Sequence, residues 1–427
     1  MEVIIDLHIH SKYARATSYN LTLDNIEKWA KIKGLSLLGT GDFQHPLWRK
    51  EIDEKLVEDE KGILRTKSGF PFIWQTEISL MFSDGKIKKR RAVHVLVFAP
   101  NRAAADKITN FLKSRGRIDY DGRPIFGIKA SEFVRELKKI DDKIEVIPAH
   151  CLTPWFGLFG SDSGFDSLAE CFGEEIKNIY AVESGMSADP GMIWRLKERV
   201  NVVSFSDAHS FWPWRLGREA TILDIDELSY DNIIKAIRTG DGLKGTIETP
   251  PEYGKYHFDG HRACNFSSSP NESKKFEGKC PVCKKLLTLG VEYRIEELAK
   301  ESEGYKPENA RAYHKLVPLH ELIALRLESK PESKKSWVIY DNLISLFQNE
   351  INILLRVSKE EFLKNKVDVK LIELILLNRE GKIKIKPGFD GEYGKVLMPG
   401  VKEVGVEERK IKFIKKVSER NPQKTLF

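Results

Sequence analysis

Histidine and acidic side chains recur at the ends of short apolar runs throughout the first 210 residues. His8 and His10 follow the first such run, and two residues apart on a strand they share one face and can bind one ion. Buried imidazoles and carboxylates are costly unless they are paired or bound to metal, and together they suit Zn, Mn or Fe. The pattern therefore predicts a metal site. Its members are His8, His10, Asp42, His45, Glu77, His94, His150, Asp207 and His209.

A second set of metal-ligand side chains lies in the middle of the chain. Two residues separate His261 from Cys264, and two separate Cys280 from Cys283 after a polar segment. Two short ligand pairs joined by such a loop are typical of a zinc ribbon, here with a histidine in place of the first cysteine. Four protein ligands leave no open position, so we expect one structural Zn²⁺. The alternative is chance clustering.

Aromatic and basic side chains accompany the first set of ligands. Rings beside a catalytic mouth can stack on an unpaired base or fill the gap left by a flipped one, and an arginine can neutralise a phosphate oxygen. The alternatives are core packing beneath the loops for the rings and a surface position for the arginines. The residues concerned are Arg15, Trp155, Phe156, Trp212, Trp214 and Arg215.

Strand and helix patterns alternate over the part of the chain that must position these residues. The expected strands are 3–7, 35–40, a pair around 70–82, 93–99, 144–148, 179–182 and 201–205; the expected helices are 22–33, 47–60, 102–115, 130–139, 190–199 and 229–239. Repeated βα units with polar residues at strand ends predict an α/β fold with a (β/α) barrel, distorted because only about seven strands are visible. The segments 116–129 and 151–166 are long enough to be functional loops.

Composition divides the rest of the chain. We expect the barrel over 1–245, a zinc-ribbon domain over 246–300, a mainly helical C-terminal domain over 301–395 and a basic tail over 396–427. Gln423, Leu426 and Phe427 match the start of a peptide that binds a sliding clamp, unless the match is coincidental.

Charge and hydropathy indicate the class of protein. The net charge of +7 is concentrated in lysine-rich runs, which favours a polyanionic partner, although each run alone is typical of a solvated surface. No apolar run approaches the roughly 20 residues that cross a bilayer, and there is no signal-like N-terminus. Five cysteines are too few and too uneven for a disulfide framework. We expect a cytoplasmic protein that acts near the nucleoid of an archaeon or bacterium and does not bind membranes.

The ordered motifs HIH, GDFQH, QTE, PAH and SDAH resemble those of the PHP (polymerase and histidinol phosphatase) superfamily. That resemblance implies a distorted (β/α)7 barrel that holds two or three divalent ions (Zn, Mg or Mn) and hydrolyses phosphoesters. It implies one ion at His8, His10, Glu77 and Asp207, and a second that shares Glu77 with His94 and His150. A third would take Asp42 or His45 with His209. The catalytic set implied is His8, His10, Glu77, His150, Asp207 and His209.

A more specific resemblance covers roughly residues 1–400. The strings GTGDFQHP, LGREAT, GHRAC…CPVC and PGFDGEYG are similar to those of the endonuclease Q family of DNA-repair enzymes. This implies cleavage of the phosphodiester 5′ of a deaminated base (hypoxanthine, uracil or xanthine) or of an abasic site. The alternatives are a small-molecule phosphoesterase of the histidinol-phosphatase type, which leaves the ribbon without a role, and a noncatalytic DNA-binding module.

Overall fold

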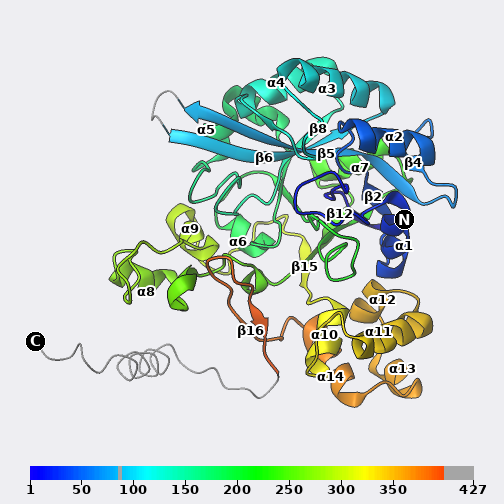
Figure 1. Cartoon of the computed structure of the whole chain (residues 1–427), viewed down its shortest axis with the longest axis vertical. Helices are drawn as coiled ribbons and strands as arrows, with labels where there is room; N and C mark the ends of the chain where they lie inside the picture. Colours follow the sequence, from blue (N-terminus) through cyan, green and yellow to red (C-terminus); the bar gives the residue numbers. More distant parts are fainter. Residues whose placement is uncertain (85–88, 399–427) are drawn as a thin grey trace, which may run out of the picture.

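The structure is a computed structural model that describes residues 1–84 and 89–398. A mixed α/β body with a central sheet occupies the upper part of Figure 1, and a group of short helices lies below it. The predicted clamp residues Gln423, Leu426 and Phe427, and the predicted basic tail from residue 399 onward, lie outside the described residues. No helix in the described ranges is long and apolar enough to cross a membrane.

The strands of the main sheet follow the order β15-β12-β11-β1-β2-β5-β4-β3, with β6 joining β5 to β8 and β7 joining β5. Strands β9 and β10 form a separate parallel pair. The strands are β1 Glu2–Asp6, β2 Leu37–Gly39, β3 Val57–Glu58, β4 Leu64–Arg65, β5 Pro71–Asp84, β6 Lys89–Ala99, β7 Ile125–Phe126, β8 Glu145–Pro148, β9 Ala181–Glu183, β10 Asn201–Val203, β11 Ala220–Asp224, β12 Leu243–Glu248, β13 Asp259–His261, β14 Phe266–Ser268, β15 Ala312–Lys315, β16 Ile385–Lys386 and β17 Lys395–Val396.

The helices cover the outside of the sheet and build the C-terminal part. They are α1 Leu23–Lys33, α2 Pro46–Lys55, α3 Arg102–Arg115, α4 Ala130–Ile140, α5 Leu168–Phe172, α6 Pro190–Trp194, α7 Tyr230–Thr239, α8 Pro270–Lys275, α9 Val291–Leu298, α10 Leu319–Arg326, α11 Lys334–Phe347, α12 Glu350–Leu355, α13 Lys359–Lys364 and α14 Val369–Arg379. The burial pattern of α4 shows why helices cover the sheet: Phe133, Val134 and Leu137 are buried, while Arg135 and Lys139 are exposed.

The predicted alternation of strands and helices is confirmed for most elements, with four corrections. Helix α2 ends at Lys55 and not at residue 60, because Leu56 is extended and Val57 begins β3. Helix α6 ends at Trp194 and not at residue 199, because Lys197 adopts a left-handed backbone with φ 60°. The expected strand pair around 70–82 is one long strand, β5, which pairs with β6. Strands β11 and β12 were not predicted, and both pair into the sheet beside β1.

The β9–β10 pair contacts the main sheet in two places, next to β8 and next to the segment that follows β1. The backbone N–H of Cys151, just after β8, donates to the Glu183 carbonyl at the end of β9. After β10, Ala208 forms an isolated parallel bridge with Ile9. The C-terminal ends of β1, β8, β9 and β10 and the middle of β5 therefore face one region, although no continuous ladder joins all these strands among the described residues.

A buried ion pair joins the main sheet region to helices α10–α14, which we call the helical unit. Lys33 Nζ, at the end of α1, lies 2.7 Å from Glu350 Oε1 at the start of α12, and both side chains are buried. Glu350 also accepts from Tyr340 Oη at 2.8 Å and from the Leu319 N–H at 3.1 Å. Next to this pair, a Cβ on Gly34 would lie 2.4 Å from Asn349 Oδ1, so glycine is needed at this close approach.

Two buried carboxyl groups lie behind the strand ends. Glu248 Oε2 accepts from the hydroxyls of Ser184 and Ser204, both at 2.9 Å. Glu219 accepts one backbone hydrogen bond, and its other oxygen, Oε2, has no partner. Burial raises the pKa of Glu219 to about 8, so this carboxyl is protonated at neutral pH.

The buried Glu219 makes stability depend on pH. Its pKa rises from 4.5 to about 8 on folding, so the folded protein holds this proton more tightly. The stability that this group contributes is fully present below its unfolded pKa and is lost as the pH rises through about 8, with a slope of up to about 1.4 kcal/mol per pH unit. Glu219→Gln should therefore lose less unfolding free energy than the wild type between about pH 5 and 8, measured by urea titration. Glu54→Gln, at an exposed position, should keep the wild-type slope; an unchanged slope in Glu219→Gln would contradict the assignment.

Candidate metal centre

Four side chains from three motifs converge where β1 and β10 end and at the middle of β5. His10 Nε2 lies 3.2 Å from Glu77 Oε2 and 3.1 Å from Asp207 Oδ1. His8 Nε2 lies 3.5 Å and 3.4 Å from the same two oxygens. The ligand atoms of all four residues lie within 4.8 Å of one another. Two imidazoles and two carboxylates around one point form a plausible ligand set for a divalent ion.

A second group shares Glu77 through its other oxygen. Glu77 Oε1 lies 2.8 Å from His94 Nδ1 and 3.1 Å from His150 Nε2. The two histidine nitrogens are 3.2 Å apart. Glu77 therefore presents one oxygen to each group, which is how a bridging carboxylate serves two neighbouring ions. We call the two groups together the strand-end site.

The charge of Glu77, the neutral ring of His94 and the burial of these side chains fit divalent ions. Burial alone would raise the pKa of Glu77, but Arg123 and His8 hold it well below its usual range, so the carboxylate is ionised. Burial lowers the pKa of His94 to about 3, which leaves its lone pair free for a metal. His8 Nε2 is buried and has no hydrogen-bond partner, although it faces Glu77 and Asp207. An ion would satisfy that nitrogen.

Carboxylates behind the strand-end site fix the orientation of the histidines. His10 Nδ1 lies 3.0 Å from Asp42 Oδ1, and His8 Nδ1 lies 2.9 Å from Glu183 Oε1. Glu183 also accepts from the backbone N–H of His150 at 2.6 Å. In metal sites, such carboxylate–histidine contacts select the ring tautomer and raise ligand basicity.

Asp6 fixes the position of the Asp207 loop. Its two oxygens accept from the Ser206 N–H at 2.9 Å, the Ser206 hydroxyl at 2.5 Å and the Gly217 N–H at 3.0 Å. Burial raises the pKa of Asp6 to about 6 even with these donors. The residue next to Ser206 is Asp207, so β1 and the residues just after it provide two candidate ligands, His8 and His10, and the support for a third.

Three motif residues adopt a left-handed backbone. The φ angles are 37° at Asp42, 29° at His150 and 47° at Asp207. For residues other than glycine this conformation costs about 1–3 kcal/mol each and persists where surrounding contacts enforce it, typically at functional sites. Each of these turns follows a strand end and directs a side chain toward the strand-end site.

The structure does not assemble the third ligand group that the sequence predicted. Asp42 uses Oδ1 on His10 and Oδ2 on the Ser11 N–H, so it supports a ligand and is not placed as one. His45 stacks on Tyr13 with ring centroids 4.6 Å apart, outside both groups. His209 packs beside His10, with Nδ1 3.0 Å from the Asp207 carbonyl. Among residues 1–84 and 89–398, no third group of converging ligands forms at these strand ends.

One charged side chain at the strand-end site was not predicted from the sequence. Arg123 Nη1 lies 3.1 Å from Glu77 Oε2, and only 26% of the side chain is exposed. In the sequence, the only indication of a role for Arg123 was the unusual length of the 116–129 segment. Glu183 was visible as an acidic residue between two motifs, but its contact with His8 depends on strands 175 residues apart.

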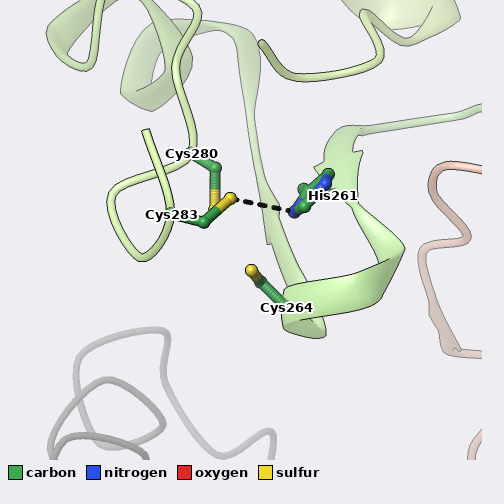
Figure 2. A group of neighbouring side chains, drawn as sticks. All are labelled: His261, Cys264, Cys280 and Cys283. Carbon is green, nitrogen blue, oxygen red and sulfur yellow. Dashed lines mark hydrogen bonds between the residues drawn. The ribbon is translucent and has the colours of Figure 1, made fainter. Parts of the chain in front are cut away.

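The predicted ribbon ligands also converge. His261, Cys264, Cys280 and Cys283 place their ligand atoms within 4.8 Å of one another, and Figure 2 shows the four side chains directed toward a common point. The hairpin of β13 and β14 brings His261 near Cys264, and Cys283 Sγ lies 3.5 Å from His261 Nδ1. We call these four residues the ribbon cluster. Their arrangement fits the tetrahedral ligand set of a structural zinc ion.

The aromatic and basic residues divide into two groups. Phe156 packs on His94 with ring centroids 4.4 Å apart, and Trp155 is 42% exposed beside Tyr256. These two rings lie on the loop beside the strand-end site. Arg15, by contrast, is ion-paired with Asp121 through Nε at 3.1 Å.

Trp214 packs between the two parts of the molecule and is only 8% exposed. Its ring contacts His320 and Trp337 of the helical unit and stacks on Trp212 at 5.5 Å. The expectation that Trp214 stacks on a base is not supported, because its faces are covered by other rings. Arg215 lies over the Tyr393 ring at 5.5 Å.

Comparisons with known proteins cover both the helical unit and the whole chain. The family model of the MJ0043 C-terminal domain matches residues 318–382, which contain α10–α14. The uncharacterized protein MJ0043 of Methanocaldococcus jannaschii is 34% identical over 292 residues. That match covers 66% of this chain and 35% of the relative, so this chain spans about a third of its length.

Two solved structures match nearly the whole chain. The lesion-specific endonuclease PfuEndoQ from Pyrococcus furiosus superposes with a TM-score of 0.83 at 31% identity, covering 96% of this chain and 99% of that one. Endonuclease Q in complex with a 27-mer duplex substrate bearing an abasic lesion at the active site gives a TM-score of 0.82 at 31% identity, covering 94% and 97%.

Glu183 provides a test of how the strand-end site is positioned. Glu183→Gln keeps the shape of the side chain but weakens its charged contact with His8, so affinity for Mn²⁺ should fall by about 10- to 100-fold, as for other carboxylates behind metal ligands. Isothermal titration measures this change. Glu174→Gln, at an exposed position nearby, should bind Mn²⁺ like the wild type. Equal affinities for Glu183→Gln and the wild type would show that Glu183 has no positioning role.

Proposed function

Because the chain belongs to the endonuclease Q family, and is therefore a hydrolase of DNA phosphodiester bonds, we propose that it is a metal-dependent repair nuclease that recognises lesions. Its proposed targets are deaminated bases (hypoxanthine, uracil and xanthine) and abasic sites. Cleavage would occur at the phosphodiester 5′ of the lesion and leave a 3′-hydroxyl and a 5′-phosphate.

The observation that carries this proposal is the shared carboxylate of Glu77. A single buried side chain joins His8, His10 and Asp207 to His94 and His150, at strand ends of a chain that matches a lesion-specific endonuclease along its length. Hydrolysis of a phosphodiester requires charge neutralisation and an activated water, and a pair of divalent ions bound here would supply both. We propose Zn, Mg or Mn for these ions.

The protein groups around the strand-end site have distinct proposed roles. Asp42 and Glu183 keep His10 and His8 in the tautomer that presents Nε2. Asp6 holds the turn that carries Asp207. His209 is 29% exposed beside His10, where it can exchange a proton with a leaving or attacking oxygen. We propose that the strands close around these groups as a distorted (β/α)7 barrel, supported by the β8–β9 and Ile9–Ala208 backbone contacts.

The remaining segments have proposed roles in holding DNA. The ribbon cluster would bind one structural Zn²⁺ and stabilise the small β13–β14 domain, proposed to span 246–300. The barrel would span 1–245, the helical domain 301–395 and the basic tail 396–427. The net charge of +7 favours the phosphate backbone. A sliding clamp remains a proposed partner for Gln423, Leu426 and Phe427.

Cleavage of a defined lesion tests the proposal. A labelled duplex that carries a single deoxyinosine is incubated with the protein and Mg²⁺, Mn²⁺ or Zn²⁺, and we expect one nick 5′ of the lesion. Asp207→Asn should lower cleavage by at least about 100-fold because it weakens the ligand set. Lesion-DNA binding by this variant should stay within a few-fold of wild type, since most phosphate contacts lie elsewhere. Asp226→Asn, at an exposed position, is the matched control and should cleave normally.

Other outcomes identify the alternatives. Release of phosphate from histidinol phosphate without any nick would indicate a small-molecule phosphoesterase. Binding of the duplex without a nick or phosphate release would indicate a noncatalytic DNA-binding module. Either result would overturn the proposed nuclease function.

A further inference from the structure

The guanidinium of Arg123 lies among the ligands of the strand-end site. Its Nη1 is 3.1 Å from Glu77 Oε2, the oxygen that also faces His10 Nε2 at 3.2 Å and His8 Nε2 at 3.5 Å. The side chain is 26% exposed, so part of it reaches solvent while its Nη1 contacts the buried carboxylate. Arg123 is thus a partly solvent-accessible cation beside the candidate metal ligands.

The other basic residues near the first motif are engaged elsewhere. Lys12 Nζ lies 2.7 Å from Glu51 Oε2, and Arg15 Nε lies 3.1 Å from Asp121 Oδ2. Arg15 was predicted either to neutralise a phosphate oxygen or to lie at the surface, and here its guanidinium is paired with Asp121. Arg123, in contrast, contacts Glu77 directly.

The backbone that carries Arg123 is held against the motif loops. Asp121, which is buried, accepts from the N–H groups of Arg123 and Arg15, both at 3.1 Å. Between them, Gly122 passes so close to Asp42 that a Cβ would lie 2.2 Å from Asp42 Oδ2. A side chain at Gly122 would therefore displace the carboxylate that orients His10. The backbone around Gly122 is therefore in direct contact with the side chains that support the strand-end site.

The same segment is also joined to the strand that carries Glu77. Strand β7 pairs with β5, with Ile125 opposite Ser79, and the Ser79 N–H donates to the Pro124 carbonyl at 3.1 Å. Glu77 lies two residues before Ser79 on β5. The separation between Arg123 and Glu77 is thus set by a short path of backbone hydrogen bonds, which suits a group that must meet its target accurately.

We propose that Arg123 contacts a non-bridging oxygen of the scissile phosphodiester, an inference that rests on the proposed nuclease function. The Glu77 oxygen that Arg123 contacts is itself a candidate metal ligand, so a divalent cation there and the guanidinium would compete for one carboxylate oxygen. A phosphate oxygen is then the anionic partner left for the guanidinium. Its fork of N–H donors matches phosphate geometry, and such a contact stabilises charge that develops on the phosphorus oxygens.

A neutral phosphate analogue tests the contact directly. Equilibrium binding is measured in Ca²⁺ to a deoxyinosine duplex with either a normal phosphodiester or an uncharged methylphosphonate at the scissile position. Wild type should prefer the phosphodiester by roughly 10-fold or more, the size expected for a charged hydrogen bond. Arg123→Ala should lose most of that preference, and Arg123→Lys should keep part of it. Arg117→Ala, at an exposed arginine of the same segment, should behave like wild type.

Manganese affinity separates phosphate binding from a structural role. If Arg123 competes with an ion for Glu77, Arg123→Ala should bind Mn²⁺ as tightly as wild type or several-fold more tightly. If Arg123 only supports Glu77, the same variant should bind Mn²⁺ more weakly, and the proposal is overturned. It is also overturned if Arg123→Ala keeps the full wild-type preference for the phosphodiester while the wild type nicks the deoxyinosine duplex. Absence of that nick in the wild type would instead overturn the proposed function.

Discussion

The site depends on one shared carboxylate. Glu77 lies in the middle of β5, is fully buried, and directs its two oxygens to different sets of histidines. A buried carboxylate is unfavourable unless cations or donors surround it, and here Arg123 and His8 keep it ionised. The motifs around it come from different strands. The arrangement of the sheet is therefore what allows one side chain to join two ligand groups.

Burying these charged and polar ligands is unfavourable in free energy, and a layer of polar contacts behind them offsets this. Asp6, Asp42 and Glu183 each hold a motif loop or a histidine ring, and their partners come from distant parts of the chain. The left-handed turns at Asp42, His150 and Asp207 persist because these contacts hold them. The segment of Arg123 adds to the same layer through Asp121 and Gly122. Substitutions well behind the metal ligands should thus affect the chemistry.

Local patterns in the sequence predicted much of this site, because the ligands lie within apolar strands or just after them. His8, His10, Glu77, His94, His150 and Asp207 are found where the motifs indicated. Helix α1 was also predictable from the sequence, because a glycine, Gly34, ends it in a left-handed turn. Spacing does not report which side of a loop faces the interior. For that reason Trp214 was expected beside DNA but packs against the helical unit, and Asp42 was expected on a metal but supports His10.

Contacts between distant segments were beyond the reach of sequence patterns. Arg123 meets Glu77 only because β7 pairs with β5, and two residues do not form a recognisable strand. Lys33 and Glu350 are 317 residues apart, and each alone resembles an ordinary surface charge. Strands β11 and β12 carry no polar motif, so they were overlooked although they complete the sheet beside β1. All three features depend on pairing between segments that are far apart in the sequence, which local patterns do not report.

Counting bound ions in variants tests most directly whether Glu77 joins two metal sites. Protein loaded with Mn²⁺ and Zn²⁺ and then desalted should hold three ions per chain, two in the strand-end site and one in the ribbon cluster. Cys280→Ser should hold two. Glu77→Gln should hold two, one in the strand-end site and one in the ribbon cluster, because an amide has a single ligand oxygen and cannot bridge two cations. Retention of three ions by Glu77→Gln would contradict the account.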